Sequence, residues 1–135
     1  MDLIDSFYIA SSGMKVQGDR LRIIAQNVAN AESVATTPGG DPYRRKTIEF
    51  KNVLDRELGV EKVVVSRYGT DDSDFVKKYD PGNPVADPQG YVLLPNVNPV
   101  IELTDMKEAQ RGYEANLNVI ETSKGMIAQT LNLLR

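Results

Sequence analysis

The segment DRLRIIAQNVANAESVATTPGGDPYRRK, residues 19–46, changes character near its middle. Its first half places apolar residues at the spacing of an amphipathic helix. Its second half contains TPGGDP, which cannot continue a helix because proline lacks an N–H group and glycine favours turns. The fold therefore depends on what covers the apolar face of this first helix.

The positions of the prolines divide the chain. All seven prolines lie between Pro38 and Pro99, and a proline inside a helix costs about 3 kcal/mol. This distribution predicts an α+β fold with two long terminal helices around a β-hairpin-rich middle. We expect an N-terminal helical segment over residues 1–34, a β-rich module over 35–102 and a C-terminal helical segment over 103–135.

The N-terminal helix, expected over about residues 3–31, carries two apolar rows. Residues spaced by seven lie on one face of a helix and are typical of coiled coils. A row displaced by two residues lies about 200° around the helix, so one partner helix cannot cover both rows. The first row is Phe7, Met14, Leu21 and Val28, and the second is Ile9, Val16 and Ile23.

The C-terminal helix is expected over about residues 104–134, with Thr104 or Asp105 as its N-cap. It also carries two rows: Met106, Tyr113, Ile120, Ile127 and Leu134 form the first, and Val119, Met126 and Leu133 form the second. We expect the first rows of the two helices to pair in an antiparallel, coiled-coil-like layer. The second rows would then face neighbouring subunits, because extended exposed apolar surface marks an interface.

The middle of the chain reads as short strands joined by turns. Segments 43–50, 60–68, 74–80 and 90–95 alternate in polarity or are rich in β-branched residues. Proline and glycine in TPGGDP, DPGNP and DPQG supply the dihedral angles that turns require. These signals predict a small module of hairpins and loops.

Composition argues against several classes of protein. The chain has 16 basic and 19 acidic residues, a balance that gives no reason to expect nucleic acid as a partner. It has neither cysteine nor histidine, and so lacks thiolate nucleophiles, thiolate metal ligands and the side chain best suited to proton transfer near neutral pH. We expect no enzyme, no catalytic residue, no bound metal and no cofactor.

Three short motifs could suggest catalysis or binding, but each is better explained as an ordinary structural segment. Ser12 and Lys15 form the S-x-x-K of serine acyltransferases, but those enzymes also need a strand-borne K-[TS]-G in a larger domain. DDSD at 71–74 lacks the glycine and final glutamate of a calcium loop, which favours a solvated acidic loop. YRRK at 43–46 is too small a basic patch for nucleic acid in an acidic chain.

The terminus MDLIDSFYIASSG has acids where a secretory signal needs basic residues, so we expect no cleaved signal peptide. No segment approaches the roughly 20 apolar residues of a membrane span. We expect a protein that does not span a membrane and that leaves the cytoplasm, if it does so, by another route.

Several blocks of sequence resemble the flagellar rod and hook axial proteins. NVANA at 27–31 followed by a loop is similar to the N-terminal signature of that family. PYRRK, YDPGNPVADPQGYVLLPNVN and DMKEAQRGYEANLNVIETSKGMIAQTL resemble its short proximal-rod members, whereas residues 52–76 match no known pattern. The matching motif residues are Asn27, Ala29, Asn30, Ala31, Tyr43, Arg44, Lys46, Asn96, Tyr113 and Asn116.

The resemblance implies a structural subunit of the bacterial flagellar basal body, involved in motility. Such a subunit would assemble through its terminal helices in the proximal rod, in the periplasmic space, and transmit torque from motor to hook and filament. Its partners would be other rod proteins, copies of itself and the flagellar type III export apparatus, which exports subunits without cleaving a signal. The alternative is a soluble helical adaptor or export chaperone.

Overall fold

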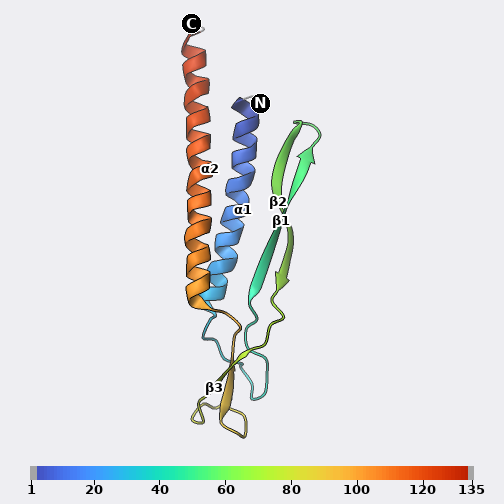
Figure 1. Cartoon of the computed structure of the whole chain (residues 1–135), viewed down its shortest axis with the longest axis vertical. Helices are drawn as coiled ribbons and strands as arrows, with labels where there is room; N and C mark the ends of the chain where they lie inside the picture. Colours follow the sequence, from blue (N-terminus) through green and yellow to red (C-terminus); the bar gives the residue numbers. More distant parts are fainter. Residues whose placement is uncertain (1–2, 134–135) are drawn as a thin grey trace. The chain divides into compact units, whose positions relative to one another are not determined.

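The computed structural model describes residues 3–133 and confirms the α+β class (Figure 1). Along the sequence, one long helix precedes four strands and a second long helix follows them. The elements are helix α1 (Leu3–Ala29), strands β1 (Lys46–Asp55), β2 (Val60–Thr70), β3 (Val76–Tyr79) and β4 (Tyr91–Leu94), and helix α2 (Pro99–Leu133). The four strands fall within or overlap the four segments predicted from sequence, including part of the stretch 52–76 that matched no known pattern.

The described residues form two compact units. Unit 1 contains residues 3–22, 48–67 and 107–133, and unit 2 contains residues 23–47 and 68–106. Each unit therefore combines helical and strand residues, and the units cut across the three segments expected from the positions of the prolines.

Helix α2 begins earlier than expected, because Asn98 and Pro99 form its start. The Asn98 side-chain oxygen accepts hydrogen bonds from the backbone N–H groups of Val100 at 3.0 Å and Ile101 at 3.4 Å. Pro99 occupies the first helical position, where its missing N–H costs nothing. The expected cap Thr104 lies inside the helix, and its hydroxyl donates to the Val100 carbonyl at 2.9 Å. The cap prediction was wrong because proline was treated only as a helix breaker.

In unit 1 the two helices run antiparallel and approach closely through small residues. A Cβ placed on Gly13 would lie 2.8 Å from the Asn116 side-chain nitrogen, and one on Gly112 would lie 3.2 Å from the Gln17 side chain. One turn toward the start of α1 therefore corresponds to one turn toward the end of α2, as in any antiparallel pair of helices. Ala109, at 0 % exposure, is also buried. Small residues therefore take part in this contact.

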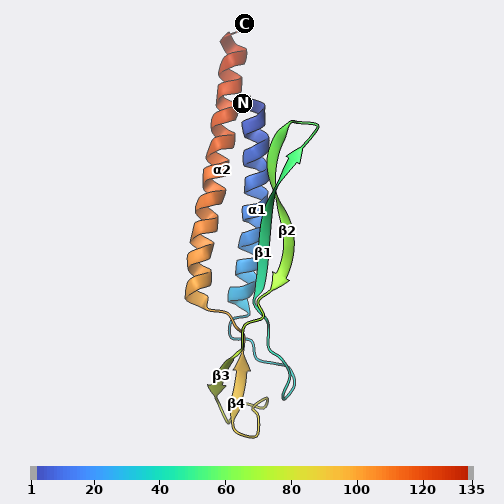
Figure 2. The same ribbon diagram turned by 45° about the vertical axis from the view of Figure 1, so that its right-hand side comes forward.

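The β1–β2 hairpin lies beside α1 in unit 1, in both views (Figure 1, Figure 2). The Val63 backbone N–H donates to the Ser12 hydroxyl at 3.3 Å, and the Lys62 ammonium lies 5.5 Å from the centre of the Tyr8 ring. Asp55 holds the hairpin turn by accepting from the N–H groups of Glu57 and Leu58. The hairpin thus supplies α1 with a second partner inside the same chain.

In unit 2, β3 and β4 form a separate antiparallel pair, with Val76 opposite Leu94 and Tyr79 opposite Tyr91. The two tyrosine rings meet edge to face at 5.3 Å between centroids. Val92 at 3 % exposure and Val97 at 8 % provide buried apolar side chains in or near this strand pair. This small hairpin is the second β element of the predicted middle module.

Candidate functional site

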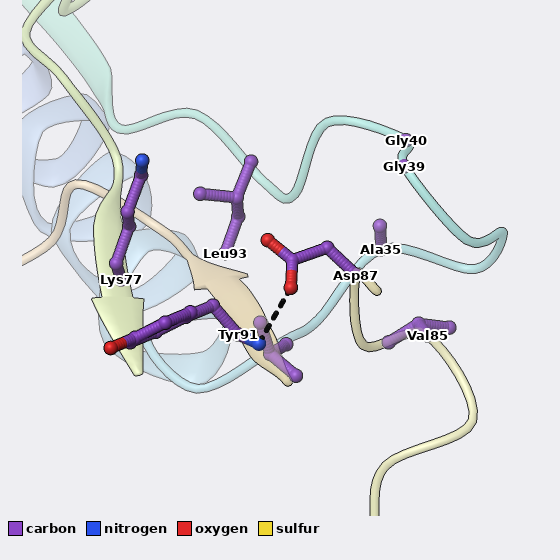
Figure 3. Close-up of a pocket in the computed structure, with 9 residues that line it drawn as sticks. Ala35, Gly39, Gly40, Lys77, Val85, Asp87, Tyr91 and Leu93 are labelled. Atoms are coloured by element: carbon purple, nitrogen blue, oxygen red, sulfur yellow. Dashed lines mark hydrogen bonds between the residues drawn. The ribbon is translucent and has the colours of Figure 1, made fainter. Parts of the chain in front are cut away.

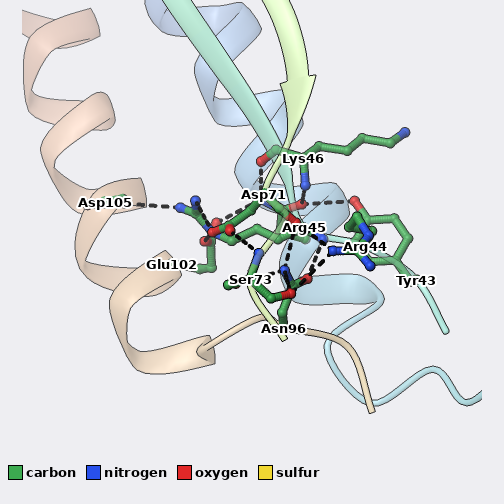
Figure 4. Close-up of polar contacts among 10 residues, drawn as sticks. Tyr43, Arg44, Arg45, Lys46, Asp71, Ser73, Asn96, Glu102 and Asp105 are labelled. Atoms are coloured by element: carbon green, nitrogen blue, oxygen red, sulfur yellow. Dashed lines mark hydrogen bonds and ion pairs between the residues drawn. The ribbon is translucent and has the colours of Figure 1, made fainter. Parts of the chain in front are cut away.

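The buried Asn27 is the centre of a polar cluster in unit 2, which we call the polar junction: Asn27, Tyr43, Arg45, Lys46, Asn96 and Glu102. Figure 4 labels the members other than Asn27. The Asn27 side-chain oxygen accepts from the Lys46 N–H at 2.9 Å and the Tyr43 hydroxyl at 2.8 Å. Its nitrogen donates to the Lys46 carbonyl at 2.9 Å and to Glu102 Oε2 at 3.1 Å. A side-chain amide has two donor and two acceptor positions, so all are used.

Glu102 is only 1 % exposed, yet both of its carboxylate oxygens are paired. Oε2 accepts from Asn27, and Oε1 accepts from Arg45 Nε at 2.6 Å. The same guanidinium lies 3.7 Å from Asp71 and 4.0 Å from Asp105. A buried carboxylate is tolerated only when it is paired and hydrogen-bonded, and Arg45 and Asn27 meet that condition.

Tyr43 connects the loop before β1 to the junction. Its hydroxyl donates to Asn27 Oδ1. Partial burial raises the pKa of the Tyr43 phenol above its ordinary value of 10.0, and the nearby negative charge of Glu102 raises it further. The hydroxyl therefore stays protonated and acts as a donor at neutral pH.

Asn96 and Arg44 extend the network to the acidic segment 71–74. Asn96 accepts from the Arg45 N–H at 2.8 Å and donates to the Asp71 carbonyl at 2.8 Å. The Arg44 guanidinium donates to the Asp71 carbonyl at 3.1 Å and lies 4.3 Å from the centre of the Phe75 ring. The Ser73 backbone amide, together with its hydroxyl and the nearby arginines, lowers the pKa of Asp71. The basic YRRK segment is thus engaged in internal contacts.

The structure therefore brings five of the predicted motif residues into one network: Asn27, Tyr43, Arg44, Lys46 and Asn96. Asn30 has a separate role, because its side chain donates to the Gln26 carbonyl at 2.8 Å and satisfies the end of α1. Ala31 is buried and Ala29 is exposed. Asn116 and the half-buried Tyr113 lie in unit 1, where Asn116 donates to the Gly112 carbonyl at 2.9 Å.

The sequence reasoning missed Arg45 and Glu102, which form the shortest pair in the junction. Arg45 lies between two motif residues in YRRK and was not distinguished from its neighbours. Glu102 lies one heptad before the buried Ala109 and therefore on the same side of the helix. A carboxylate on the buried side of a helix is a sign in the sequence that it has a partner. It was overlooked because the helix was expected to begin only at residue 104.

The residues predicted to form the subunit interface differ in how exposed they are in the structure. Val16 and Ile23 are 4 % and 7 % exposed, so they are buried within the single chain. The expectation that both stay exposed in the single chain was wrong, because only helices were considered as partners for α1. Their part in a subunit interface stays a prediction. Ile9 is half-buried, whereas the α2 residues are exposed: Val119 at 43 %, Met126 at 47 % and Leu133 at 86 %.

The residues predicted to pair the helices occupy intermediate positions. Phe7 is 37 % exposed, and Leu134 lies outside the described residues. The others are half-buried: Met14, Leu21, Val28, Met106, Tyr113, Ile120 and Ile127. Close approaches between the helices are documented at Gly13 and Gly112, and pairing through the large rows stays a prediction.

The surface of the described residues includes two hollows of interest. One, in unit 1, has a volume of about 410 Å³ and is lined by uncharged residues of both helices: Leu3, Ser6, Asn118, Val119, Thr122, Ser123 and Met126. The other, in unit 2, has a volume of about 180 Å³ and includes Lys77, Asp87 and Tyr91 (Figure 3). Asp87 accepts from the backbone N–H groups of Gln89 and Tyr91, so its carboxylate holds the turn before β4.

The motifs considered in the sequence as catalytic or metal-binding can be placed in the structure. The Ser12 hydroxyl donates to the Ile9 carbonyl at 2.7 Å and accepts from Val63, which joins α1 to β2. Within residues 3–133, no group of three or more acidic side chains is arranged to hold a metal ion. Over the same residues, neither helix has the length and apolar character required to cross a membrane.

Comparison with known proteins gives a consistent result. Residues 89–133 match the family model described as flagellar basal body rod FlgEFG protein C-terminal. Flagellar basal-body rod protein FlgC of Agrobacterium fabrum is 54% identical over 127 residues, covering 94% of this chain and 91% of that protein. FlgC of Salmonella typhimurium is 42% identical over 135 residues, covering 98% of each chain. FlgC of Borreliella burgdorferi is 39% identical over 153 residues, covering 100% of this chain and 99% of that protein. With such identity over nearly its whole length, the chain belongs to the FlgC family of flagellar basal-body rod proteins.

Proposed function

We propose that the chain is a subunit of the proximal flagellar rod that assembles, with other rod proteins and copies of itself, through exposed faces of its terminal helices. The observation that carries this proposal is the apolar row Val119, Met126 and Leu133 on α2, whose members are 43 %, 47 % and 86 % exposed. Contiguous exposed apolar surface is costly in water and typically marks a protein interface. Phe7 on α1 is also partly exposed, at 37 %.

The polar junction supports a mechanical role. A buried network in which every member is paired rigidifies the segments that it joins. Here it fixes the end of α1, the start of β1 and the start of α2 within unit 2. A subunit that transmits torque from motor to hook and filament needs its helices held at such fixed points, because a flexible connection would bend under load instead of transmitting it.

The absence of catalysis is part of the proposal. In the junction, the carboxylate of Glu102, the guanidinium of Arg45 and the amide of Asn27 bind one another rather than an open cavity. Export by the flagellar type III apparatus to a rod position in the periplasmic space is also part of the proposal, and membership of the FlgC family supports it.

The test is complementation in a flagellated bacterium that lacks its own FlgC. We expect the full chain to restore swimming and to be present in purified basal bodies. Export of the chain into the medium without incorporation into basal bodies would contradict a structural role. Restored swimming without the chain in the basal body would favour an adaptor or chaperone instead.

A further inference from the structure

Two side-chain amides lie on glycines where α1 and α2 meet in unit 1. A Cβ placed on Gly13 would lie 2.8 Å from Asn116 Nδ2 and 2.9 Å from Asn116 Oδ1. A Cβ placed on Gly112 would lie 3.2 Å from both Cδ and Nε2 of Gln17. Each helix therefore provides one amide and one glycine, and each amide fills the space that the opposite glycine leaves. We call these four residues the amide–glycine contact.

The spacing of the four residues makes the contact reciprocal. Gly13 and Gln17 are four residues apart on α1, and Gly112 and Asn116 are four residues apart on α2. Residues at this spacing lie on one face of a helix. The Asn116 side chain is also held in place on α2, because its Nδ2 donates to the Gly112 carbonyl at 2.9 Å. The contact thus defines one antiparallel alignment of the two helices.

Gln17 contributes bulk to this contact, whereas its oxygen makes no hydrogen bond. Within residues 3–133, Gln17 Oε1 is buried and has no hydrogen-bond partner. A buried acceptor without a partner lowers stability. Polar residues that lower the stability of a helix pair can nevertheless select one alignment of the helices over others. The unpaired oxygen of Gln17 therefore indicates a role in alignment rather than in stability.

The large apolar rows do not fix the alignment along the helix axis, which is called the register. Rows spaced by seven face each other again whenever one helix slides by seven residues, about 10 Å. The amide–glycine contact does not repeat in this way. Sliding by seven residues in one direction, for example, would put Val119 in the place of the glycine opposite Gln17.

Sliding by one turn is disfavoured by size. A shift of four residues in one direction would set Gln17 against Asn116, so that two amides would compete for the same space. A shift in the other direction would set Gly13 against Gly112 and leave a gap. Overfilled and underfilled contacts both lower stability, because protein interiors are close-packed. Of these three alignments, only the observed one gives each amide a glycine.

We propose that Gln17 and Asn116, each seated on a glycine of the opposite helix, select the register of α1 against α2 in unit 1. The register decides which exposed residues of the two helices lie level with one another, and so the surface that the pair presents. The inference goes beyond the proposed function and does not depend on it, because it concerns pairing within one chain.

Two double variants of identical amino-acid composition test the proposal. Exchange between the helices, Gln17→Gly with Gly112→Gln, keeps one amide opposite one glycine at each level. Exchange within α1, Gly13→Gln with Gln17→Gly, sets amide against amide at one level and glycine against glycine at the other. For the purified full chain, we expect the first variant to unfold within about 3 °C of the unsubstituted chain. The second variant should unfold at least about 5 °C lower than the first.

Spin labels report the register directly. Lys15→Cys and Lys124→Cys introduce two cysteines into a chain that has none, at exposed positions of unit 1. In the observed alignment Lys15 lies level with Glu114, so the labels are about 15 Å apart along the axis, and a shift of four residues changes this by about 6 Å. Double electron–electron resonance should give one shared separation for the unsubstituted chain and the exchange between helices. The exchange within α1 should give a different or divided separation.

Two single variants separate size from other effects. Gln17→Met keeps the length of the side chain and removes the unpaired oxygen, so the unfolding temperature should rise while the label separation stays the same. Gly18→Gln is the matched control for Gly13→Gln, because nothing lies within 4 Å of a Cβ placed on Gly18. It should not lower the unfolding temperature, since glutamine favours helix more than glycine does.

Three results would overturn the proposal. Equal unfolding temperatures for the two exchange variants would mean that composition and helix propensity explain both. An unchanged label separation in the exchange within α1 would assign the register to other contacts, such as the bond between Asn27 and Glu102 in unit 2. An unsubstituted chain without a defined separation would show that the contact selects no register. The rod assignment is tested separately, by the presence of the chain in basal bodies.

Discussion

Asn27 and Glu102, which are 75 positions apart in the sequence, are joined by a buried hydrogen bond of 3.1 Å between Nδ2 and Oε2. This bond ties the end of α1 to the first turns of α2 inside unit 2. Both side chains are only 1 % exposed, so water cannot replace either partner. The fold of unit 2 thus rests partly on polar contacts that a search for apolar rows does not find.

Asn27→Ala should destabilise the protein by about 3 kcal/mol, because it leaves the Tyr43 hydroxyl, the Lys46 backbone and Glu102 without partners in a buried site. Urea denaturation followed by circular dichroism measures the change. The exposed Asn132→Ala is the control and should alter stability by less than about 0.5 kcal/mol. Equal stabilities for the two variants would contradict the central place given to Asn27.

Arg45→Ala should cost about 3–5 kcal/mol, since it leaves the buried carboxylate of Glu102 without its cationic partner. The exposed pair Arg67–Glu49 offers a matched comparison, because its members are 69 % and 55 % exposed. Arg67→Ala should cost less than about 1 kcal/mol. A comparable loss from both variants would mean that burial does not govern the Arg45 pair.

Tyr43→Phe should make the protein less sensitive to alkaline pH. The pKa of Tyr43 is raised in the folded state, so the folded chain holds this proton more tightly than the unfolded chain. The resulting stability is complete below the ordinary pKa of 10.0 and is lost as the pH rises through the folded-state pKa. Denaturation measured on both sides of that pH should show a smaller decline in Tyr43→Phe than in the exposed Tyr68→Phe.

Gly125→Ala should stabilise the chain by up to about 1 kcal/mol, because nothing lies within 4 Å of the added Cβ and alanine favours helix. Gly13→Ala should not give this gain, because its Cβ would lie 2.8 Å from the Asn116 side-chain nitrogen. Adding Asn116→Ala to Gly13→Ala should recover it. Thermal unfolding of the three variants checks the order, and an equal gain from Gly13→Ala alone would show that the helices have room there.

Val16→Asp and Val119→Asp should separate folding from assembly. Val16 is 4 % exposed, so an unpaired carboxylate there should destabilise the subunit by several kcal/mol. Val119 is 43 % exposed, and its replacement should change monomer stability by less than about 1 kcal/mol while preventing incorporation into basal bodies. Denaturation of the purified variants and their content in basal bodies provide the two measurements. A Val16→Asp variant as stable as the unsubstituted chain would contradict the burial of Val16 within the subunit.

The positions of the prolines and the rows of apolar residues were sufficient to predict the two helices, and alternation with β-branched residues predicted the strand segments. The family was indicated by the resemblance of several sequence blocks to known proteins. The same reasoning failed for the exposure of Val16 and Ile23, because periodicity reveals that a helix has two apolar faces but not which part of the chain covers the second. It also failed for Arg45 and Glu102. Their pairing depends on a contact across 57 positions, which no local pattern encodes.

The hydrogen bonds of Asn27 reach residues 16, 19 and 75 positions later in the chain. A nascent polypeptide leaving the ribosome cannot complete this set until Glu102 has emerged, when most of the message has been read. Closing so long a loop carries an entropic cost that only the finished set of bonds repays. Translation products that end before Glu102 therefore cannot complete the hydrogen bonds that hold the end of α1.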